Sequence, residues 1–181
     1  MNRMNRFIAT LCIAALSAAP AFAALRNGVQ APDFKARASI GGKQFDFALA
    51  DALKKGPVVL YFYPAAFTPG CTIEAHMFAD AMEDFQKLGA TVIGVSHDSI
   101  QTLDKFSLTE CRSKFPVAAD ESGRIMNSYD AVCGGDPDTA DRVSYVISPE
   151  GKILFNYTSE DPTYHVEYTM NAVKGYLAAR K

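Results

Sequence analysis

The segment from Pro64 to Cys71, with the sequence PAAFTPGC, limits the possible folds of this chain more than any other feature. It follows an apolar run, residues 58–63, and precedes a stretch with helical periodicity. A buried strand, a turn and a helix start in this order are typical of α/β proteins. Cys71 then lies in the first helical turn, where unpaired backbone N–H groups and the helix dipole favour a thiolate. This setting predicts a reactive cysteine rather than a buried structural one.

Apolar residues later in the chain alternate between helix and strand periodicity. The stripe that follows Cys71 consists of Ile73, Met77, Ala81, Phe85 and Leu88, and Gly89 ends it. Residues 91–95 predict a strand, residues 143–147 and 153–157 predict a hairpin, and a closing helix is predicted from Val166, Met170, Val173 and Leu177. Residues 24–44 carry mainly turn signals and are expected to be largely irregular. The pattern predicts an α/β fold in which helices flank a central sheet.

The N-terminus has the three parts of an export signal. Arg3 and Arg6 form a positive region, residues 7–19 are mostly apolar, and residues 21–23 read Ala-Phe-Ala, the form of a cleavage site. Residues 1–23 are therefore predicted to be a signal peptide, and residues 24–181 the mature domain. The apolar run is too short for a membrane anchor, which needs about 20 apolar residues. The sequence thus predicts an exported protein with no membrane segment after cleavage.

The composition of the mature region excludes several classes of function. The region is long enough for one domain with its own core. The full chain has 18 basic and 20 acidic residues, and no basic patch indicates a nucleic-acid partner. His76, His97 and His165 are isolated in the sequence, so each is expected on the surface or in a loop rather than as a metal ligand. Without a ligand cluster or a phosphate-binding loop, the sequence predicts neither a metal nor an organic cofactor.

Pro64, Thr68 and Cys71 have the spacing of the peroxiredoxin active-site motif, and the chain resembles that family. Residues 61–74 are most similar to its bacterioferritin-comigratory, or Q-type, branch, within the alkyl hydroperoxide reductase and thiol-specific antioxidant superfamily. The resemblance covers nearly the whole chain from about residue 28 to residue 177. It implies a thioredoxin-like fold, with a central mixed β-sheet flanked by helices.

The same resemblance implies an activity and partners. The chain is expected to be a thiol-dependent peroxidase that reduces hydrogen peroxide and organic hydroperoxides, in antioxidant defence and redox homeostasis. Its reductant would be thioredoxin-like or another thiol, and it would be a monomer or a homodimer. For an exported thiol enzyme of bacterial type, the periplasm is the expected location.

The resemblance also implies a role for each residue of the motif. Cys71 would be the peroxidatic nucleophile, which attacks the peroxide and becomes a sulfenic acid. The backbone N–H groups of Gly70 and Cys71 would supply hydrogen bonds to the developing charge. Thr68 would bring its hydroxyl to the sulfur and the peroxide, and Pro64 would shield the sulfur from water. Read without the resemblance, Thr68 is an ordinary turn or cap residue and Pro64 only ends a strand.

Two charged residues complete the implied site. Arg142, at the start of a predicted strand, matches the family's active-site arginine, and Glu74 would orient it. Spacing alone would instead favour an arginine in solvent and a surface ion pair on the helix. With its head at the pocket and its stem at the sheet edge, Arg142 is expected to act on the rate, and Arg142→Met to change stability little.

The regeneration of Cys71 leaves several routes open. The mature region keeps Cys71, Cys111 and Cys133, and the position five residues after Cys71, where many Q-type proteins carry a resolving cysteine, is His76. Cys111 is the first candidate for the resolving cysteine, and Cys133 is the alternative. A static bridge between Cys111 and Cys133, or reduction by an external thiol, also remains open.

Two functions of other classes compete with a peroxidase. An exported thioredoxin-like disulfide oxidoreductase would need a Cys-x-x-Cys pair, which the sequence lacks. A non-catalytic binding module on a thioredoxin fold would not need Pro64, Thr68, Cys71 and Arg142 together. An assay of peroxide consumption separates the three functions.

Overall fold

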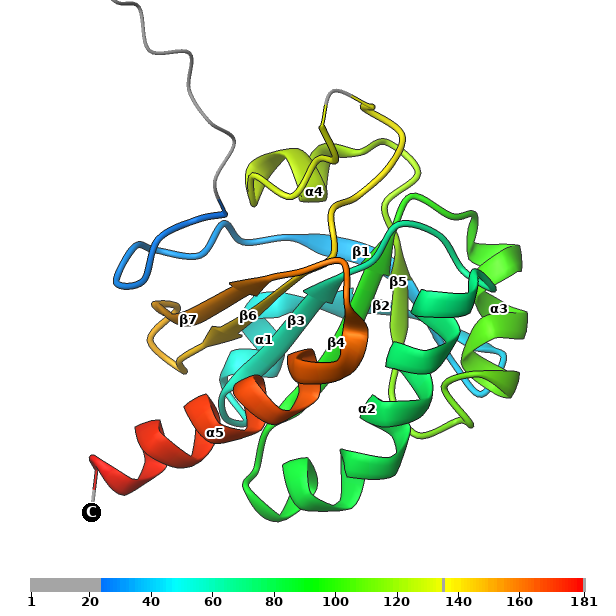
Figure 1. Ribbon diagram of the computed structural model, residues 1–181. Coiled ribbons are helices and arrows are strands. Elements are labelled where there is room, and N and C mark those ends of the chain that lie inside the picture. The colour runs from blue at the N-terminus through cyan, green and yellow to red at the C-terminus, as the bar shows by residue number, and fades with distance from the viewer. Residues whose placement is uncertain (1–23, 135, 181) are drawn as a thin grey trace, which may run out of the picture.

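A seven-stranded mixed sheet forms the centre of the computed structural model, which describes residues 24–134 and 136–180 (Figure 1). The strands are β1 (Lys35–Ile40), β2 (Lys43–Ala48), β3 (Val58–Phe62), β4 (Thr91–Ser96), β5 (Val117–Ala119), β6 (Val143–Ile147) and β7 (Ile153–Thr158). Their order across the sheet is β2-β1-β5-β4-β3-β6-β7. β3, β4 and β5 run parallel, whereas the outer strands pair antiparallel with their neighbours. The predicted signal peptide, residues 1–23, lies outside the described residues.

Helices cover both faces of the sheet. They are α1 (Leu49–Leu53), α2 (Pro69–Lys87), α3 (Ile100–Thr109), α4 (Arg124–Ser128) and α5 (His165–Ala178), with a short 3-10 turn, η1 (Pro162–Tyr164). In the described part of the chain, no helix combines the length and the apolar character needed to cross a membrane. The predicted α/β arrangement, with helices around a central mixed sheet, is confirmed.

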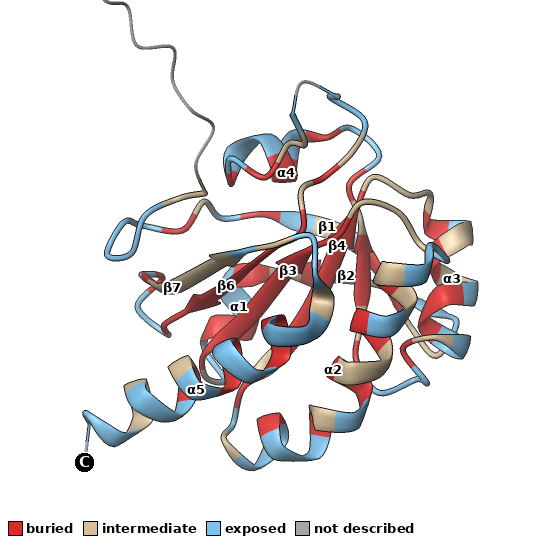
Figure 2. Ribbon diagram, in the orientation of Figure 1, coloured by how far each residue is buried: buried red, intermediate tan, exposed pale blue. Residues whose placement is uncertain are grey.

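β3 divides the interior into two cores because successive side chains of a strand point to opposite faces. Val58, Leu60 and Phe62 pack with residues of α1 and α4 on one face. On the other face, Val59 and Tyr61 pack with residues of α2, α3 and α5. Figure 2 shows the central strands buried and the outer sides of the helices exposed. The functional cysteine predicted from the sequence belongs to the second core.

The prediction that residues 24–44 are largely irregular was wrong for β1. This strand pairs antiparallel with β2 over its full length and with β5 at Ala38 and Ser39. Its sequence, KARASI, alternates charged or polar residues with mostly small ones, so the apolar signal is weak. The strand forms because its backbone finds partners on both sides, which a local pattern does not report.

The predicted apolar stripe of α2 was wrong at Ile73, which is 51% exposed. Phe85 is buried as expected, and Met77, Ala81 and Leu88 pack against the core while partly buried. The buried residues of this helix are Cys71, Glu74, Ala75, Phe78, Ala79, Met82 and Phe85. Glu74 takes an inward position because a buried arginine lies there to pair with it. The stripe of α5 was predicted better, since Val166, Met170 and Val173 are buried.

Candidate active site

The loop between β3 and α2 brings the motif to one edge of the sheet. Pro64 follows β3 and is half-buried, and Thr68 is the N-cap residue of α2. The carboxylate of Asp98 accepts a hydrogen bond from the backbone N–H of Ala66 at 2.8 Å and so fixes the loop. Phe67 has a left-handed backbone, φ 65°, which is strained for a bulky residue. Such strain persists only where the surroundings hold the chain in place.

Cys71 lies in the first turn of α2 and is 1% exposed. Its sulfur is 3.5 Å from Nη2 of Arg142, so a permanent cation donates toward it. Gly70 makes this approach possible, because a Cβ at that position would lie 2.9 Å from the same nitrogen. The helix start and the guanidinium together give the sulfur a positive environment, which favours an anion.

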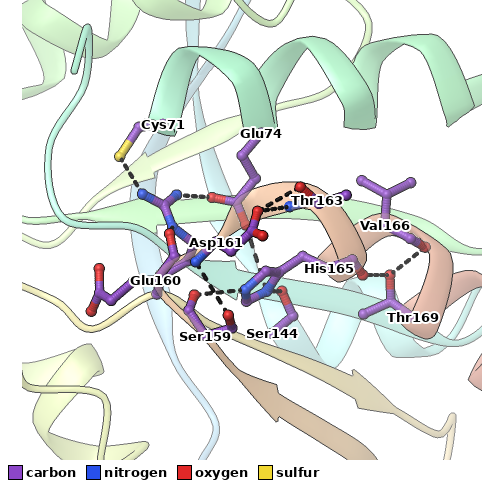
Figure 3. A network of polar contacts seen from close by, with 11 residues as sticks. Cys71, Glu74, Ser144, Ser159, Glu160, Asp161, Thr163, His165, Val166 and Thr169 are labelled. Carbon is purple, nitrogen blue, oxygen red and sulfur yellow. Dashed lines mark hydrogen bonds and ion pairs between the residues drawn. The ribbon is translucent and has the colours of Figure 1, made fainter. Parts of the chain in front are cut away.

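Arg142 directs each side of its guanidinium to a different partner, and Figure 3 labels the partners Cys71, Glu74 and Glu160. Nη1 donates to Oε2 of Glu74 at 2.5 Å, and Nε donates to the carbonyl oxygen of Glu160 at 3.0 Å. Arg142 is only 4% exposed and Glu74 is fully buried. The interpretation of these residues as a solvated arginine and a surface ion pair is therefore wrong. The rigid fork is held in the orientation that points Nη2 at Cys71.

Thr68 and Pro64 precede Cys71 in the segment that joins β3 to α2. The hydroxyl of Thr68 donates to the carbonyl oxygen of Ala65 at 3.0 Å, and the residue is exposed. Because a hydroxyl has one hydrogen and two lone pairs, this bond leaves the Thr68 oxygen able to accept. The sequence interpretation brought this hydroxyl to the sulfur and the peroxide. In the structure, the hydroxyl donates its hydrogen to Ala65 instead.

His165 and Ser144 belong to the same network, although no sequence pattern indicated either of them. The expectation of His165 on the surface or in a loop was wrong, because it is fully buried at the start of α5. Nδ1 of His165 is 2.8 Å from Oγ of Ser144 and 3.7 Å from Oε1 of Glu74. One signal could have found Ser144: it lies two positions after Arg142, so both face the same side of the sheet. A serine within an apolar strand needs a polar partner.

Burial shifts the pKa values of the two titratable groups behind Arg142. Burial raises the pKa of the Glu74 carboxyl to about 8, although Arg142 opposes the shift. Burial lowers the pKa of His165 to about 4, and Arg142 adds to this effect. Both shifts favour neutral forms at neutral pH, as expected for groups removed from water.

The three cysteines of the described region are free and differ in exposure. Cys111 follows α3 and is fully buried, whereas Cys133 is half-buried in the loop before β6. Burial raises the pKa of the Cys111 thiol strongly, and the neighbouring Glu110 adds to the shift. The structure contains no bridge between Cys111 and Cys133, so both thiols are available for reaction once they are exposed.

Comparison with known proteins agrees with this geometry. Residues 27–155 match the sequence profile of the AhpC/TSA family. The chain belongs to this family. A Helicobacter pylori relative named as a peroxiredoxin of the bcp type is 41% identical over 107 residues, which are 59% of this chain and 67% of the relative. The chloroplastic peroxiredoxin Q of Populus jackii is 30% identical over 154 residues, 84% of this chain and 70% of the relative.

A solved peroxiredoxin structure has the same fold. The crystal structure of peroxidoxin BcpB from Mycobacterium tuberculosis is 28% identical, with a TM-score of 0.76 over 83% of this chain and 97% of that one. The AhpC/TSA chain described here therefore has a thioredoxin-like fold and is a thiol-dependent peroxidase. A disulfide oxidoreductase and a non-catalytic binding module are not supported.

Proposed function

We propose that Cys71 is the peroxidatic nucleophile and that the enzyme reduces hydrogen peroxide and small organic hydroperoxides. The observation that carries the proposal is the sulfur at the start of α2 with Nη2 of Arg142 at 3.5 Å. A thiolate is the reactive form, and a helix N-terminus and a cation both favour it.

The first step transfers one oxygen atom to the sulfur. The Cys71 thiolate attacks one peroxide oxygen, a sulfur–oxygen bond forms, and the oxygen–oxygen bond breaks. The sulfur is oxidised to a sulfenic acid, and the other oxygen takes a proton and leaves as water or an alcohol. Arg142 and the backbone N–H groups of Gly70 and Cys71 stabilise the negative charge that develops on the leaving oxygen.

Thr68 and Pro64 orient and shelter the peroxide in this proposal. The Thr68 hydroxyl gives its hydrogen to Ala65, so its oxygen accepts the O–H of the incoming peroxide. That hydrogen bond turns the peroxide so that one oxygen faces the sulfur. Pro64 has no N–H to offer and its ring keeps water away from Cys71. Glu74 holds Arg142 in place through Oε2.

Cys111 is the proposed resolving cysteine. Its thiol condenses with the Cys71 sulfenic acid, which forms a disulfide and releases water, and an external thiol such as a thioredoxin-like protein then reduces the disulfide. Because Cys111 is buried, the step requires local opening. Arg112 (φ 49°) and Ser113 (φ 56°) directly follow it in left-handed conformations, and this strain favours release of the segment. Cys133 and direct reduction by external thiol are the competing outcomes.

Export and location are part of the proposal. Cleavage after Ala23 would release residues 24–181 into the periplasm, where the enzyme acts as a monomer or a homodimer. N-terminal sequencing of protein from its native host tests cleavage, and a chain that still begins at Met1 would exclude it.

The decisive experiment compares the mature protein with Cys71→Ser. We expect thiol-dependent peroxide consumption in the parent and none in the variant, while circular dichroism shows that both are folded. If Cys71→Ser keeps the parent's turnover, Cys71 is not the nucleophile.

The mass of the parent after one equivalent of peroxide separates the routes of regeneration. A sulfenic acid adds one oxygen, whereas an internal disulfide removes two hydrogens. Peptide mapping should give a Cys71–Cys111 disulfide. A Cys71–Cys133 disulfide, or a sulfenic acid that persists until external thiol is added, would reject Cys111.

A further inference from the structure

His165 is a buried titratable residue that the chemistry above does not use. Nε2 lies 3.0 Å from the carbonyl oxygen of Ser159. A carbonyl oxygen only accepts, so Nε2 carries the ring hydrogen and donates it. In the neutral ring, Nδ1 is then an acceptor, and the hydroxyl of Ser144 donates to it at 2.8 Å.

Glu74 faces this nitrogen with an oxygen that lacks a hydrogen bond. Oε2 accepts from Arg142, whereas Oε1 is buried and has no hydrogen-bond partner among the described residues. Oε1 lies 3.7 Å from Nδ1 of His165 (Figure 3). Nδ1 already accepts the hydrogen of Ser144, so Oε1 is the buried acceptor left without a hydrogen, which is unfavourable unless Oε1 takes up a proton.

We propose that His165 is a positioning residue of the Cys71 site: it shares one buried proton with Glu74, and that proton determines how much of the Arg142 charge is left for the sulfur. With the proton in place, Oε1 is a hydroxyl, Oε2 still accepts from Arg142, and the guanidinium charge is left for the Cys71 thiolate. Once the proton is lost, the carboxylate competes for that charge, and Arg142 stabilises the reacting sulfur and the leaving oxygen less. The inference rests on Cys71 being the nucleophile.

The surroundings place this proton on Glu74 rather than on His165. The groups that face the imidazole are Arg142 and Ser144 at β6, Glu74 on α2, Tyr157 on β7, and Ser159 and Asp161 before η1. Burial, the largest cause, and Arg142 disfavour an imidazolium and hold the His165 pKa at about 4, although the hydrogen bond to Ser159 and the charge of Asp161 oppose this shift. The Glu74 pKa of about 8 keeps the proton on the carboxyl at neutral pH. The proton therefore leaves as the pH rises through about 8.

The test is the pH dependence of Cys71 oxidation by hydrogen peroxide in stopped flow, with each rate divided by the thiolate fraction from ultraviolet absorbance. In the wild type, we expect this rate to fall on the order of tenfold as the pH rises through about 8. In Glu74→Gln, whose amide cannot ionise, the rate should stay level across the same range. A wild-type rate without this fall, or a fall that persists in Glu74→Gln, overturns the inference.

Ser144→Ala tests the role of His165 and leaves the imidazole in place. The variant deletes the donor to Nδ1, so the Glu74–His165 pair holds its proton more tightly and the fall in rate moves to higher pH. The matched control is His76→Asn, which breaks the partly exposed pair of His76 Nε2 with Glu110 at 2.8 Å. It should leave the midpoint in place. An unmoved midpoint in Ser144→Ala, or a moved one in His76→Asn, contradicts the proposal.

The imidazole itself gives an independent readout. Nitrogen-15 NMR of the wild type at neutral pH should show His165 neutral with its proton on Nε2, and an imidazolium there would overturn the inference. The two proposals fail separately. If Cys71→Ser is oxidised like the parent, the nucleophile is wrong. If Cys71 reacts but the pH profile is the same in Glu74→Gln and Ser144→Ala as in the wild type, only the proposal of the shared proton is wrong.

Discussion

Cys71 and Cys111 are alike in burial and opposite in electrostatic environment. Both are free thiols with 1% exposure or less, and both belong to the core on the α2 face of the sheet. Cys71 lies at the start of a helix beside the Arg142 guanidinium. Cys111 follows the end of α3, next to Glu110, and burial together with this carboxylate raises the pKa of its thiol. The negative end of a helix also disfavours an anion.

The comparison shows that burial alone does not decide the reactivity of these cysteines. At Cys71, a helix N-terminus and a cation replace the stabilisation that water would give a thiolate. At Cys111, nothing replaces the water that burial removes and Glu110 adds a charge of the wrong sign, so the thiol stays unreactive until its segment opens into water. This suits a residue that should react only after Cys71 has been oxidised, as proposed above.

The largest expected effect is a difference in alkylation between the two thiols. At neutral pH, iodoacetamide should label Cys71 on the order of a thousandfold faster than Cys111, because each unit of raised pKa lowers the thiolate fraction tenfold. Peptide mass spectrometry of a Cys133→Ser protein measures both sites without interference. Unfolded protein is the control, in which the two rates should become similar. Comparable rates in the folded protein would show that the two environments do not make the thiols differ in reactivity.

The next effect concerns the cation that distinguishes Cys71. Arg142→Met removes a preorganised donor, which typically costs about a hundredfold or more in rate. The variant should also be less stable, which corrects the expectation from the sequence of little change. The neutral Glu74 carboxyl loses its hydrogen-bond partner in the core, and a buried polar group left without a partner costs about 1–3 kcal/mol. Arg142→Lys keeps the charge but not the fork, so it should restore only part of the rate.

A double variant separates the two consequences of losing Arg142. Arg142→Met with Glu74→Met leaves no carboxyl group buried without its partner, so thermal melts should recover much of the lost stability. The rate of Cys71 oxidation should stay low. Recovery of both would mean that Arg142 acts through folding alone, and the contrast between the two cysteines would lose its electrostatic explanation.

The features that the sequence predicted well are local ones. A strand, a turn and a helix start lie within about fifteen residues of Pro64 and are encoded by neighbouring side chains. The helix start that favours a thiolate at Cys71 therefore follows from residues next to it in the chain. Arg142 was added through resemblance to a family, because its partners Cys71 and Glu74 are 71 and 68 residues away in the chain.

The features that the sequence did not predict depend on how distant elements meet. His165 enters the site because α5 begins beside β6, and Ser144 meets it across 21 residues. The burial of Glu74 depends on Arg142, so an apolar count along α2 placed Ile73 inside and did not find Glu74 there. No pattern within a single helix or strand carries this information, since the pairing arises only when the layers pack.

The smallest expected effect tests the charge beside Cys111. Glu110→Gln removes the lesser of the two causes that raise the Cys111 pKa, while burial, the larger cause, remains. The contribution of a partly exposed charge is about 0.2–1 kcal/mol, so formation of the Cys71–Cys111 disulfide should accelerate only about two- to fivefold. Oxidation of Cys71 should not change.

Rapid quenching and mass spectrometry follow both steps, and Glu83→Gln, at an exposed pair with Lys87, is the matched control. A hundredfold acceleration would show that charge rather than burial restrains Cys111. A slower step would show instead that the contact of Glu110 with His76 positions the thiol for attack.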